Sequence, residues 1–227
     1  MRIVFPLLLG IVGCAILISL GVWQLQRLSW KAALLADIAA RIDGPAEPLP
    51  SAERALADPR AMRFQPVRVD GRTTGEEVLV LSGRTGEGAG FEVIAAFETA
   101  EGRRILVDRG FLADGKQKVQ RPPVRLTVAG NLHYPQETDS FTPAPDTARR
   151  LWFARDVPSM AAELGTEPIL VVARDVTGDT QGIDPVPVSA DGIPNDHRQY
   201  AITWFSLAVV WAGMTGYLMW RIRRKVV

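Results

Sequence analysis

Two long apolar stretches lie near the ends of the chain, and polar residues interrupt the apolar pattern everywhere between them. The first stretch runs from Ile3 to Val22 and the second from Tyr200 to Trp220, and neither contains a charged side chain. A helix needs about 20 apolar residues to cross the roughly 30 Å of hydrocarbon in a bilayer. The pattern therefore predicts two transmembrane helices that bracket the rest of the chain.

The first apolar stretch has two competing interpretations. Arg2 precedes it, as in a signal peptide, but Trp23-Gln24-Leu25 follows where a small-residue cleavage site and polar sequence are expected. Ile11-Val12-Gly13-Cys14 resembles a lipobox, although the residues from Ala15 to Leu20 remain apolar. Both alternatives stay open, and we favour a retained span in which Cys14 is a small apolar residue.

Positive charge next to the second stretch predicts the orientation. Four cations lie within Arg221–Lys225, which is typical of a cytoplasmic flank. Two spans then place both termini in the cytoplasm and the intervening segment outside. No Arg-rich and Ser-rich presequence comes before the first stretch, which favours a bacterial inner membrane with a periplasmic outer domain.

Short alternating segments separated by turn residues follow the first stretch. The helical pattern continues from Trp23 to Ile42, and the strands we expect after it are Phe64–Arg72, Glu77–Ser82, Phe91–Phe97, Arg104–Leu112, Val124–Leu132 and Ile169–Ala173. A short helix is expected through Leu164, with Asp156 as its N-cap and Gly165 past its end. This pattern predicts a mostly β outer domain, either an antiparallel sheet or a small barrel with a short helix.

The chain therefore divides into six segments. We expect a transmembrane helix at residues 1–22, a juxtamembrane helix at 23–44 and a periplasmic mostly-β domain at 45–194. A capped entrance to the second span follows at 195–199, then a second transmembrane helix at 200–220 and a basic cytoplasmic tail at 221–227. We interpret the Pro-rich and Gly-rich stretch from Thr177 to Pro194 as a connector.

The composition limits the kinds of binding site that the chain can form. The 227 residues carry a formal net charge of +1, which argues against a generally basic nucleic-acid binder. One cysteine and two histidines exclude an intramolecular disulfide, a Cys-x-x-Cys motif and a site of three imidazoles.

No catalytic motif survives inspection. Gly83–Gly90 is glycine-rich but lacks the Gly-Lys-Ser/Thr ending of a phosphate-binding loop, so we interpret it as a loop between strands. No Gly-x-Ser-x-Gly elbow is present, and Asp108-Arg109-Gly110 is interpreted as a local ion pair and turn at the end of a strand. We therefore predict that the protein is not an enzyme.

The run from Asn195 to Trp204 opens the second span and carries the most informative residues. With Asp196 as the cap, Gln199 takes the reciprocal position of a capping box and His197 lies in the first turn. A helix N-terminus disfavours an imidazolium, and a neutral imidazole is the form that binds metal ions and haem iron. A surface or hydrogen-bonding role for His197 is the alternative, and His133, expected in a turn, is a weaker candidate ligand.

Several motifs together resemble the Surfeit-locus family of cytochrome c oxidase assembly proteins. They are Gly21–Arg27 with Trp30-Lys31, Gly90–Val93, Leu106–Phe111, Trp152 with Arg155-Asp156, Glu167–Ile169 and Asn195–Trp204. The family often has Asn in place of Asp108. The resemblance runs over nearly the whole chain, and the two-span topology with an outer domain agrees with it.

The resemblance implies a role in the maturation of haem-copper oxidases. It implies haem a as a transiently bound cofactor, delivered to oxidase subunit I, and His197 as the residue that binds the haem iron. We expect a holding site between the two spans in which Trp23, Tyr200 and Trp204 line the porphyrin, while Arg27, Lys31 and Arg198 face its propionates. Each of these cations and aromatics has an alternative role as a plain interfacial residue.

The alternative function is a haem-free scaffold that stabilises an oxidase assembly intermediate through protein contacts alone. The expected partners are oxidase subunit I, other oxidase subunits, membrane lipid and, as a further candidate, haem A synthase. We expect no nucleic-acid partner.

Overall fold

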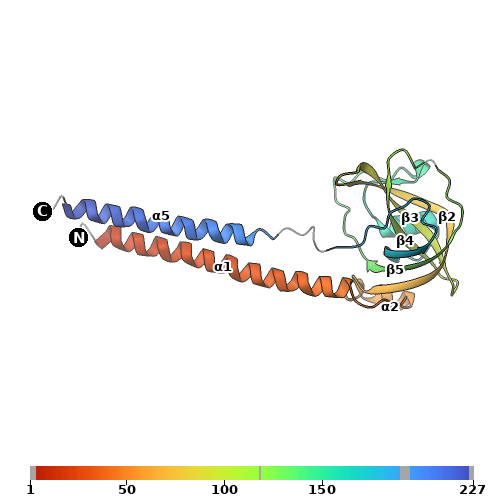
Figure 1. Ribbon diagram of the computed structural model, residues 1–227, viewed down its shortest axis with the longest axis horizontal. Helices are drawn as coiled ribbons and strands as arrows, with labels where there is room; N and C mark the ends of the chain where they lie inside the picture. The colour runs from red at the N-terminus through yellow and green to blue at the C-terminus, as the bar shows by residue number, and fades with distance from the viewer. Residues whose placement is uncertain (1–3, 118, 190–194, 225–227) are drawn as a thin grey trace. The chain divides into compact units, whose positions relative to one another are not determined.

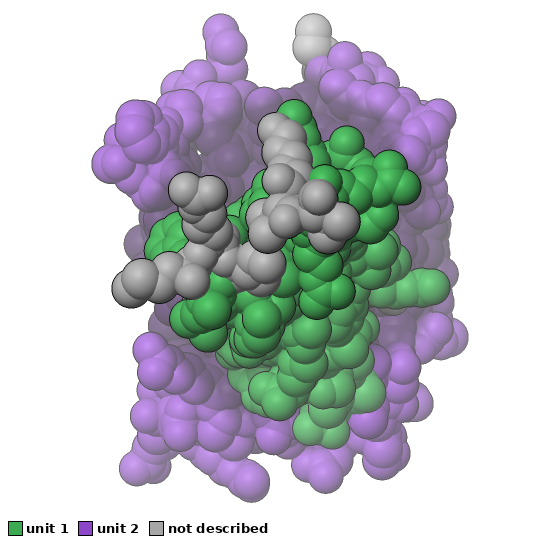
Figure 2. Space-filling model, turned by 90° about the vertical axis from the view of Figure 1, so that its left-hand side faces the viewer, with its two compact units in different colours: residues 1–37, 190–227 green, residues 38–189 purple. Residues whose placement is uncertain are grey.

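The computed structural model describes residues 4–117, 119–189 and 195–224. The chain divides into two compact units, one of residues 1–37 with 190–227 and the other of residues 38–189 (Figure 2). The first unit contains the second apolar helix and the first one up to Asp37, and the second unit contains the strands.

Helices α1 (Val4–Ile42) and α5 (His197–Arg224) contain the two apolar stretches. Helix α1 continues without interruption through the segment expected to prolong the first stretch. Both helices are long and apolar enough to cross a membrane, and most of their apolar side chains are exposed. The two helices lie side by side in unit 1 (Figure 1).

Glycines on α1 let α5 approach closely. A Cβ atom at Gly21 would lie 2.7 Å from ring atoms of Phe205, and one at Gly13 would overlap the indole of Trp211. Near the same face, the Cys14 thiol lies 3.9 Å from the carbonyl oxygen of Ala208. Small residues at a helix interface allow this kind of backbone approach.

A closed five-stranded barrel forms the centre of unit 2 (Figure 1). Its strands, β2 (Pro66–Arg84), β3 (Gly88–Thr99), β4 (Arg104–Ala113), β7 (Leu170–Gly178) and β5 (Arg125–His133), pair in that order around the ring, and β5 pairs again with β2. The β4–β7 pairing is parallel and the other four are antiparallel. The expected small barrel is confirmed, but its pairing is not purely antiparallel.

The alternation along the strands separates two apolar clusters. All five strands contribute to one of them, which includes Val67, Phe97, Val107, Val128 and Val171. Residues of β2, β3, β4 and β7 form the other cluster with helix α4 (Val157–Leu164), which buries Val157, Met160, Ala161 and Leu164 at helical spacing. Strand β4 and the first half of β7 are therefore buried on both faces, which explains the apolar runs Ile105–Val107 and Leu170–Ala173.

Short elements complete the unit. Strands β1 (Glu47–Pro48) and β6 (Leu151–Trp152) each pair in parallel with β2. Helices α2 (Ala52–Ala57) and α3 (Pro59–Met62) follow β1, and the 3-10 helix η1 (Thr147–Arg149) precedes β6. The sequence pattern did not predict these five elements, because each is too short to show a periodicity.

Two predictions about strands β2 and β3 need correction. The segments Phe64–Arg72 and Glu77–Ser82, expected as separate strands, lie largely in the single strand β2, which begins at Pro66 and is irregular between Thr73 and Glu77. The expected loop Gly83–Gly90 is mostly strand, because β2 runs to Arg84 and β3 begins at Gly88.

Helix α4 begins and ends where expected, but its start lacks the expected hydrogen bond. Asp156 occupies the N-cap position without a side-chain hydrogen bond to the helix, whereas Gly165 closes the helix in the left-handed conformation. The expected connector begins inside β7, whose last residues are Thr177 and Gly178. Part of it, residues 190–194, lies outside the described residues.

Candidate functional site

His197 is the first residue of α5. The carbonyl oxygen of Asp196 accepts hydrogen bonds from the N–H groups of Gln199, at 3.0 Å, and Tyr200, at 3.2 Å, which closes the first turn around the histidine. The His197 side chain is half-buried, and Ala201, one turn further along, is buried. The face of α5 that carries His197 is therefore the face packed toward α1.

Gln24 of α1 is the hydrogen-bond partner of His197. Its Oε1 lies 2.7 Å from Nδ1 of the imidazole, and the Gln24 residue is only 8% exposed. An amide oxygen accepts hydrogen bonds and cannot donate them, so Nδ1 carries the proton in this contact. In a neutral ring, Nε2 then keeps its lone pair and is the nitrogen able to bind a metal.

The aromatic and cationic residues expected around the site fall into two groups. Arg27 lies over the indoles of Trp23 and Trp30, with its guanidinium carbon 6.0 Å and 4.9 Å from the ring centroids. Trp23 is exposed beside it. These three side chains form a cation–π stack along α1, one helical turn apart.

The remaining predicted site residues lie on the two helices and differ in their exposure. Trp204 and Lys31 are half-buried, whereas Tyr200 and Arg198 are exposed. The hydrogen bond that the structure shows for the His197 imidazole is made with Gln24, which is not one of the six predicted companions.

Sequence reasoning missed Gln24, although the residue stands inside the motif Gly21–Arg27. A signal was present, because Gly21, Gln24, Leu28 and Lys31 recur at helical spacing and share one face of the helix. A polar amide on that face, in line with a close-packing glycine, marks a contact with the neighbouring helix.

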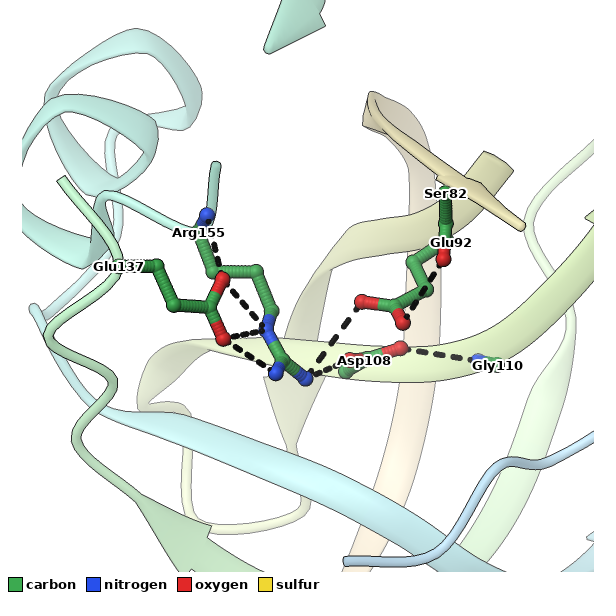
Figure 3. A network of polar contacts seen from close by, with 6 residues as sticks. All are labelled: Ser82, Glu92, Asp108, Gly110, Glu137 and Arg155. Carbon is green, nitrogen blue, oxygen red and sulfur yellow. Dashed lines mark hydrogen bonds and ion pairs between the residues drawn. The ribbon is translucent and has the colours of Figure 1, made fainter. Parts of the chain in front are cut away.

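A second polar cluster lies in the barrel domain around Arg155 (Figure 3). Its guanidinium Nη1 lies 3.5 Å from carboxylate oxygens of both Glu92 and Asp108, and its Nε donates to Glu137 at 3.0 Å. One cation thus faces three carboxylates on separate segments, and the Asp108 side chain is only 2% exposed. The cluster holds the loop before α4 against strands β3 and β4.

Asp108 is the most buried acid of this cluster. Burial and the neighbouring Glu92 carboxylate raise the pKa of Asp108 to about 7, although Arg155 opposes the shift. Gly110, with a φ of 112°, donates its N–H to Asp108 Oδ1 at 3.0 Å. The left-handed backbone at this position favours glycine, which explains the spacing of Asp108 and Gly110.

Asp108 and Arg109 do not form the local ion pair expected from the sequence. They lie within β4, where neighbouring side chains point to opposite faces. Arg109 instead donates to Gln181 Oε1 at 3.0 Å and to the carbonyl oxygen of Thr180 at 2.9 Å. Burial lowers the pKa of this guanidinium, which is satisfied by neutral acceptors.

His133 is the last residue of β5 and not part of a turn as expected. Its ring stacks on Phe64 with 5.8 Å between centroids, and the residue is 7% exposed. Burial, followed by the nearby guanidinium groups of Arg155 and Arg63, lowers the pKa of His133 to about 4. The imidazole is therefore neutral at physiological pH and belongs to the packing of the barrel domain.

Comparison with known sequences decides the family. A sequence profile described as the SURF1 family matches residues 11–209, which is most of the chain. The chain belongs to the SURF1 family. The match includes both Gln24 and His197 in the helix pair and Arg155 in the barrel domain.

Individual relatives agree with this assignment. The chain is 30% identical over 220 residues to a SURF1-like protein of Rickettsia felis, covering 89% of this chain and 91% of the relative. It is 29% identical over 227 residues to Surfeit locus protein 1 of Rattus norvegicus, covering 89% of this chain and 71% of that protein. The SURF1 relationship thus extends over both apolar helices and the domain between them.

Proposed function

We propose that this SURF1 protein is a membrane-anchored assembly factor for cytochrome c oxidase that holds haem a and aids its insertion into the catalytic subunit. The observation that carries the proposal is the pairing of His197 with Gln24, which leaves Nε2 of a half-buried imidazole with a free lone pair. The pairing lies at the start of an apolar helix, where a hydrophobic cofactor has access from the bilayer.

The donor set supports haem in preference to a free metal ion. Among the described residues, no group of three or more His, Cys, Asp and Glu side chains could hold a metal ion. A single imidazole holds a metal firmly only when the other ligands arrive with the metal. Haem a would bring most of the ligands of its iron with it, so that the single imidazole nitrogen of His197 would be enough for a weak holding site.

The chain's own residues supply the remaining functions of the site. Gln24 orients the imidazole, and the exposed aromatic side chains of Trp23 and Tyr200 provide apolar surface at the same end of the helix pair. Arg27 keeps its in-plane N–H groups available while its face stacks on two indoles, so it can still bind a carboxylate such as a propionate. Arg198 is exposed beside His197 and is the second candidate for this role.

The location follows from the same features. We propose a bacterial inner membrane, two spans formed by α1 and α5, both termini in the cytoplasm and the barrel domain in the periplasm. Exposed apolar side chains along both helices support burial in lipid, and the basic residues in the last turn of α5 support a cytoplasmic C-terminus. Oxidase subunit I is the proposed partner that receives haem, and haem A synthase is a candidate to supply it.

The test is the visible absorption spectrum of the full-length protein purified from cells that make haem a. The His197→Ala variant should lose the haem absorbance while it still inserts and accumulates, because the apolar residues after Ala201 drive insertion. His133→Ala removes the chain's other imidazole and is the matched control, with an unchanged spectrum expected.

Two outcomes contradict the haem-holding role. If wild-type protein carries no haem a, or if the His197→Ala variant keeps its full haem content, then the haem-free scaffold replaces the holding site as the proposed function. Deletion of the gene tests the role in oxidase assembly independently of haem binding. If the protein is an oxidase assembly factor, the deletion strain should still synthesise oxidase subunits, but these should be poorly metallated, whether or not the protein holds haem.

A further inference from the structure

We infer that Gln24 is a positioning residue that fixes His197 in the tautomer with its proton on Nδ1 and presents Nε2 for ligation. The inference rests on the proposed function for its ligand but on the structure for its geometry. The contact joins residues 173 positions apart in the sequence, at 2.7 Å between Oε1 and Nδ1. It therefore depends on the antiparallel packing of α1 and α5.

The direction of the hydrogen bond follows from the chemistry of the two groups. The Oε1 atom is a carbonyl oxygen and only accepts, so the proton between the atoms belongs to the imidazole. A neutral imidazole has one protonated nitrogen, so fixing the proton on Nδ1 leaves Nε2 unprotonated. Histidines that bind metals commonly hold their second ring nitrogen in this way, and loss of the partner weakens metal binding.

The surroundings of Gln24 favour one orientation of its side chain. The residue is 8% exposed, and Gly21, one turn earlier, allows Phe205 to pack directly against the backbone of α1. A buried amide in this position needs a hydrogen-bond partner, and His197 supplies it. The imidazole and the amide therefore hold each other in a fixed geometry before any ligand arrives.

A merely structural role for Gln24, as a polar contact between two helices, makes a different prediction. Such a contact would stabilise the helix pair without any preference between the tautomers of His197. A measurement of the protonated ring nitrogen distinguishes the two roles without any bound haem.

The first experiment records ¹⁵N NMR spectra of the ligand-free full chain with labelled histidine, in detergent at a pH that keeps imidazoles neutral. The chain has only two histidines, so a His133→Ala sample assigns both sets of signals. In the wild type, Nδ1 of His197 should be protonated and Nε2 bare. The Gln24→Met variant keeps a similar length but lacks the acceptor, and its His197 signals should shift toward the other tautomer.

Two further variants complete the series. Gln24→Glu keeps an oxygen acceptor and should retain the Nδ1-protonated form. Gln26→Met is the matched control, because Gln26 is exposed and stands two positions from Gln24, which places it on a different face of the same helix. Unchanged His133 signals in every sample show that the barrel domain remains folded, so a shift at His197 then reports the local contact.

The second experiment adds haem a to the same proteins and measures its affinity and its reduction potential. Gln24→Met should weaken binding by about 10- to 100-fold, the usual effect of losing such a partner. Gln24→Glu should bind haem and lower its reduction potential, because a carboxylate makes the imidazole a stronger donor. Gln26→Met should match the wild type in both measurements.

The outcomes separate this inference from the proposed function. If Gln24→Met leaves both the tautomer and the haem affinity at wild-type values, Gln24 is not a positioning residue, although haem binding stands. If the wild type binds no haem a, the proposed function fails, and the tautomer spectra alone decide whether Gln24 sets the proton position. Equal proportions of the two tautomers in the wild type would overturn the inference in either case.

Discussion

Glu137 accepts hydrogen bonds from both the backbone and the side chain of Arg155, at 3.1 Å from the amide nitrogen and 3.0 Å from Nε. The double contact fixes the guanidinium, whose other end reaches Glu92 and Asp108 on neighbouring strands. Arg155 is therefore the only positive charge of a cluster that contains three carboxylates among the described residues around it. The stability of the barrel domain should depend strongly on this one side chain.

Replacement of Arg155 by Met should destabilise the barrel domain by about 3 kcal/mol or more, because it leaves buried carboxylates without their cation. Hydrogen exchange of β4 peptides in the detergent-solubilised full chain measures the loss. Arg149→Met is the control, since Arg149 is exposed and its ion pair with Asp146 spans 3.5 Å, and it should change stability by less than about 0.5 kcal/mol. Equal effects of the two variants would show that the cluster is not a structural centre.

Asp108→Asn should gain stability relative to the wild type as the pH rises from about 4 to about 7. The folded protein raises the pKa of Asp108 from 3.8 to about 7, so the folded state binds this proton more tightly than the unfolded state. The wild type therefore loses stability as the pH rises through this window, and Asn, which stays neutral, does not. The difference should grow by up to about 1.4 kcal/mol per pH unit. Denaturation of both proteins across the range tests this, and a constant difference would contradict it.

His133→Phe should gain stability relative to the wild type as the pH falls, which is opposite to the pH dependence expected for Asp108→Asn. The folded protein lowers the pKa of His133 from 6.5 to about 4, so only the unfolded state takes up this proton between those values. The wild type therefore loses stability as the pH falls from 6.5 to 4, and the Phe variant lacks this loss. In the wild type, the effects of Asp108 and His133 on stability oppose each other as the pH changes. A plot of stability against pH should therefore be flatter for the wild type than for the Asp108→Asn or the His133→Phe variant.

Gly21→Ile should separate α1 from α5, because even a Cβ at this position lies 2.7 Å from ring atoms of Phe205. The separation should break the contact between Gln24 and His197 and shift the His197 tautomer in the NMR experiment. Gly213→Ile is the control on α5, where an added Cβ meets no atom within 4 Å. A normal His197 spectrum in the Gly21 variant would show that the helices tolerate a wider spacing.

A reporter enzyme that is active only in the periplasm should be inactive when it is fused after Val227. The same reporter inserted in the turn at Gly86 should be active, because the turn joins β2 and β3 of the proposed periplasmic domain. Activity of the C-terminal fusion would reverse the proposed orientation. Mass analysis of the intact protein tests acylation of Cys14 separately, since a diacyl adduct would mean that the first helix is processed.

The sequence predicted the elements that depend on local patterns. The two apolar helices and the cores of the main strands follow from runs and alternation of apolar residues that extend over several turns or pairs. The predicted break between the strands Phe64–Arg72 and Glu77–Ser82 was wrong. The strand instead continues through an irregularity, and Gly75 adopts a φ of 84° within it.

The parts that the sequence did not predict depend on contacts between distant residues. The parallel pairing of Leu106 with Leu170 joins strands whose order in the ring no local pattern specifies. The same is true of Arg155 with Asp108 and of His197 with Gln24, where each side chain alone has an ordinary surface interpretation. His197 was identified by its position at a helix start and by family resemblance, whereas its partner required the packed structure.

The ring closure of the barrel has a consequence for incomplete chains. Strand β7 fills the gap between β4 and β5 and ends at Gly178, before α5 begins at His197. A polypeptide that stops before Leu170 would leave two long strand edges unpaired, which are sites for aggregation and degradation. One that stops between residues 178 and 197 would complete the barrel and lack only the second helix. Premature termination on either side of this strand should therefore yield two distinct products, one removed by proteases and one that accumulates as a folded domain without His197.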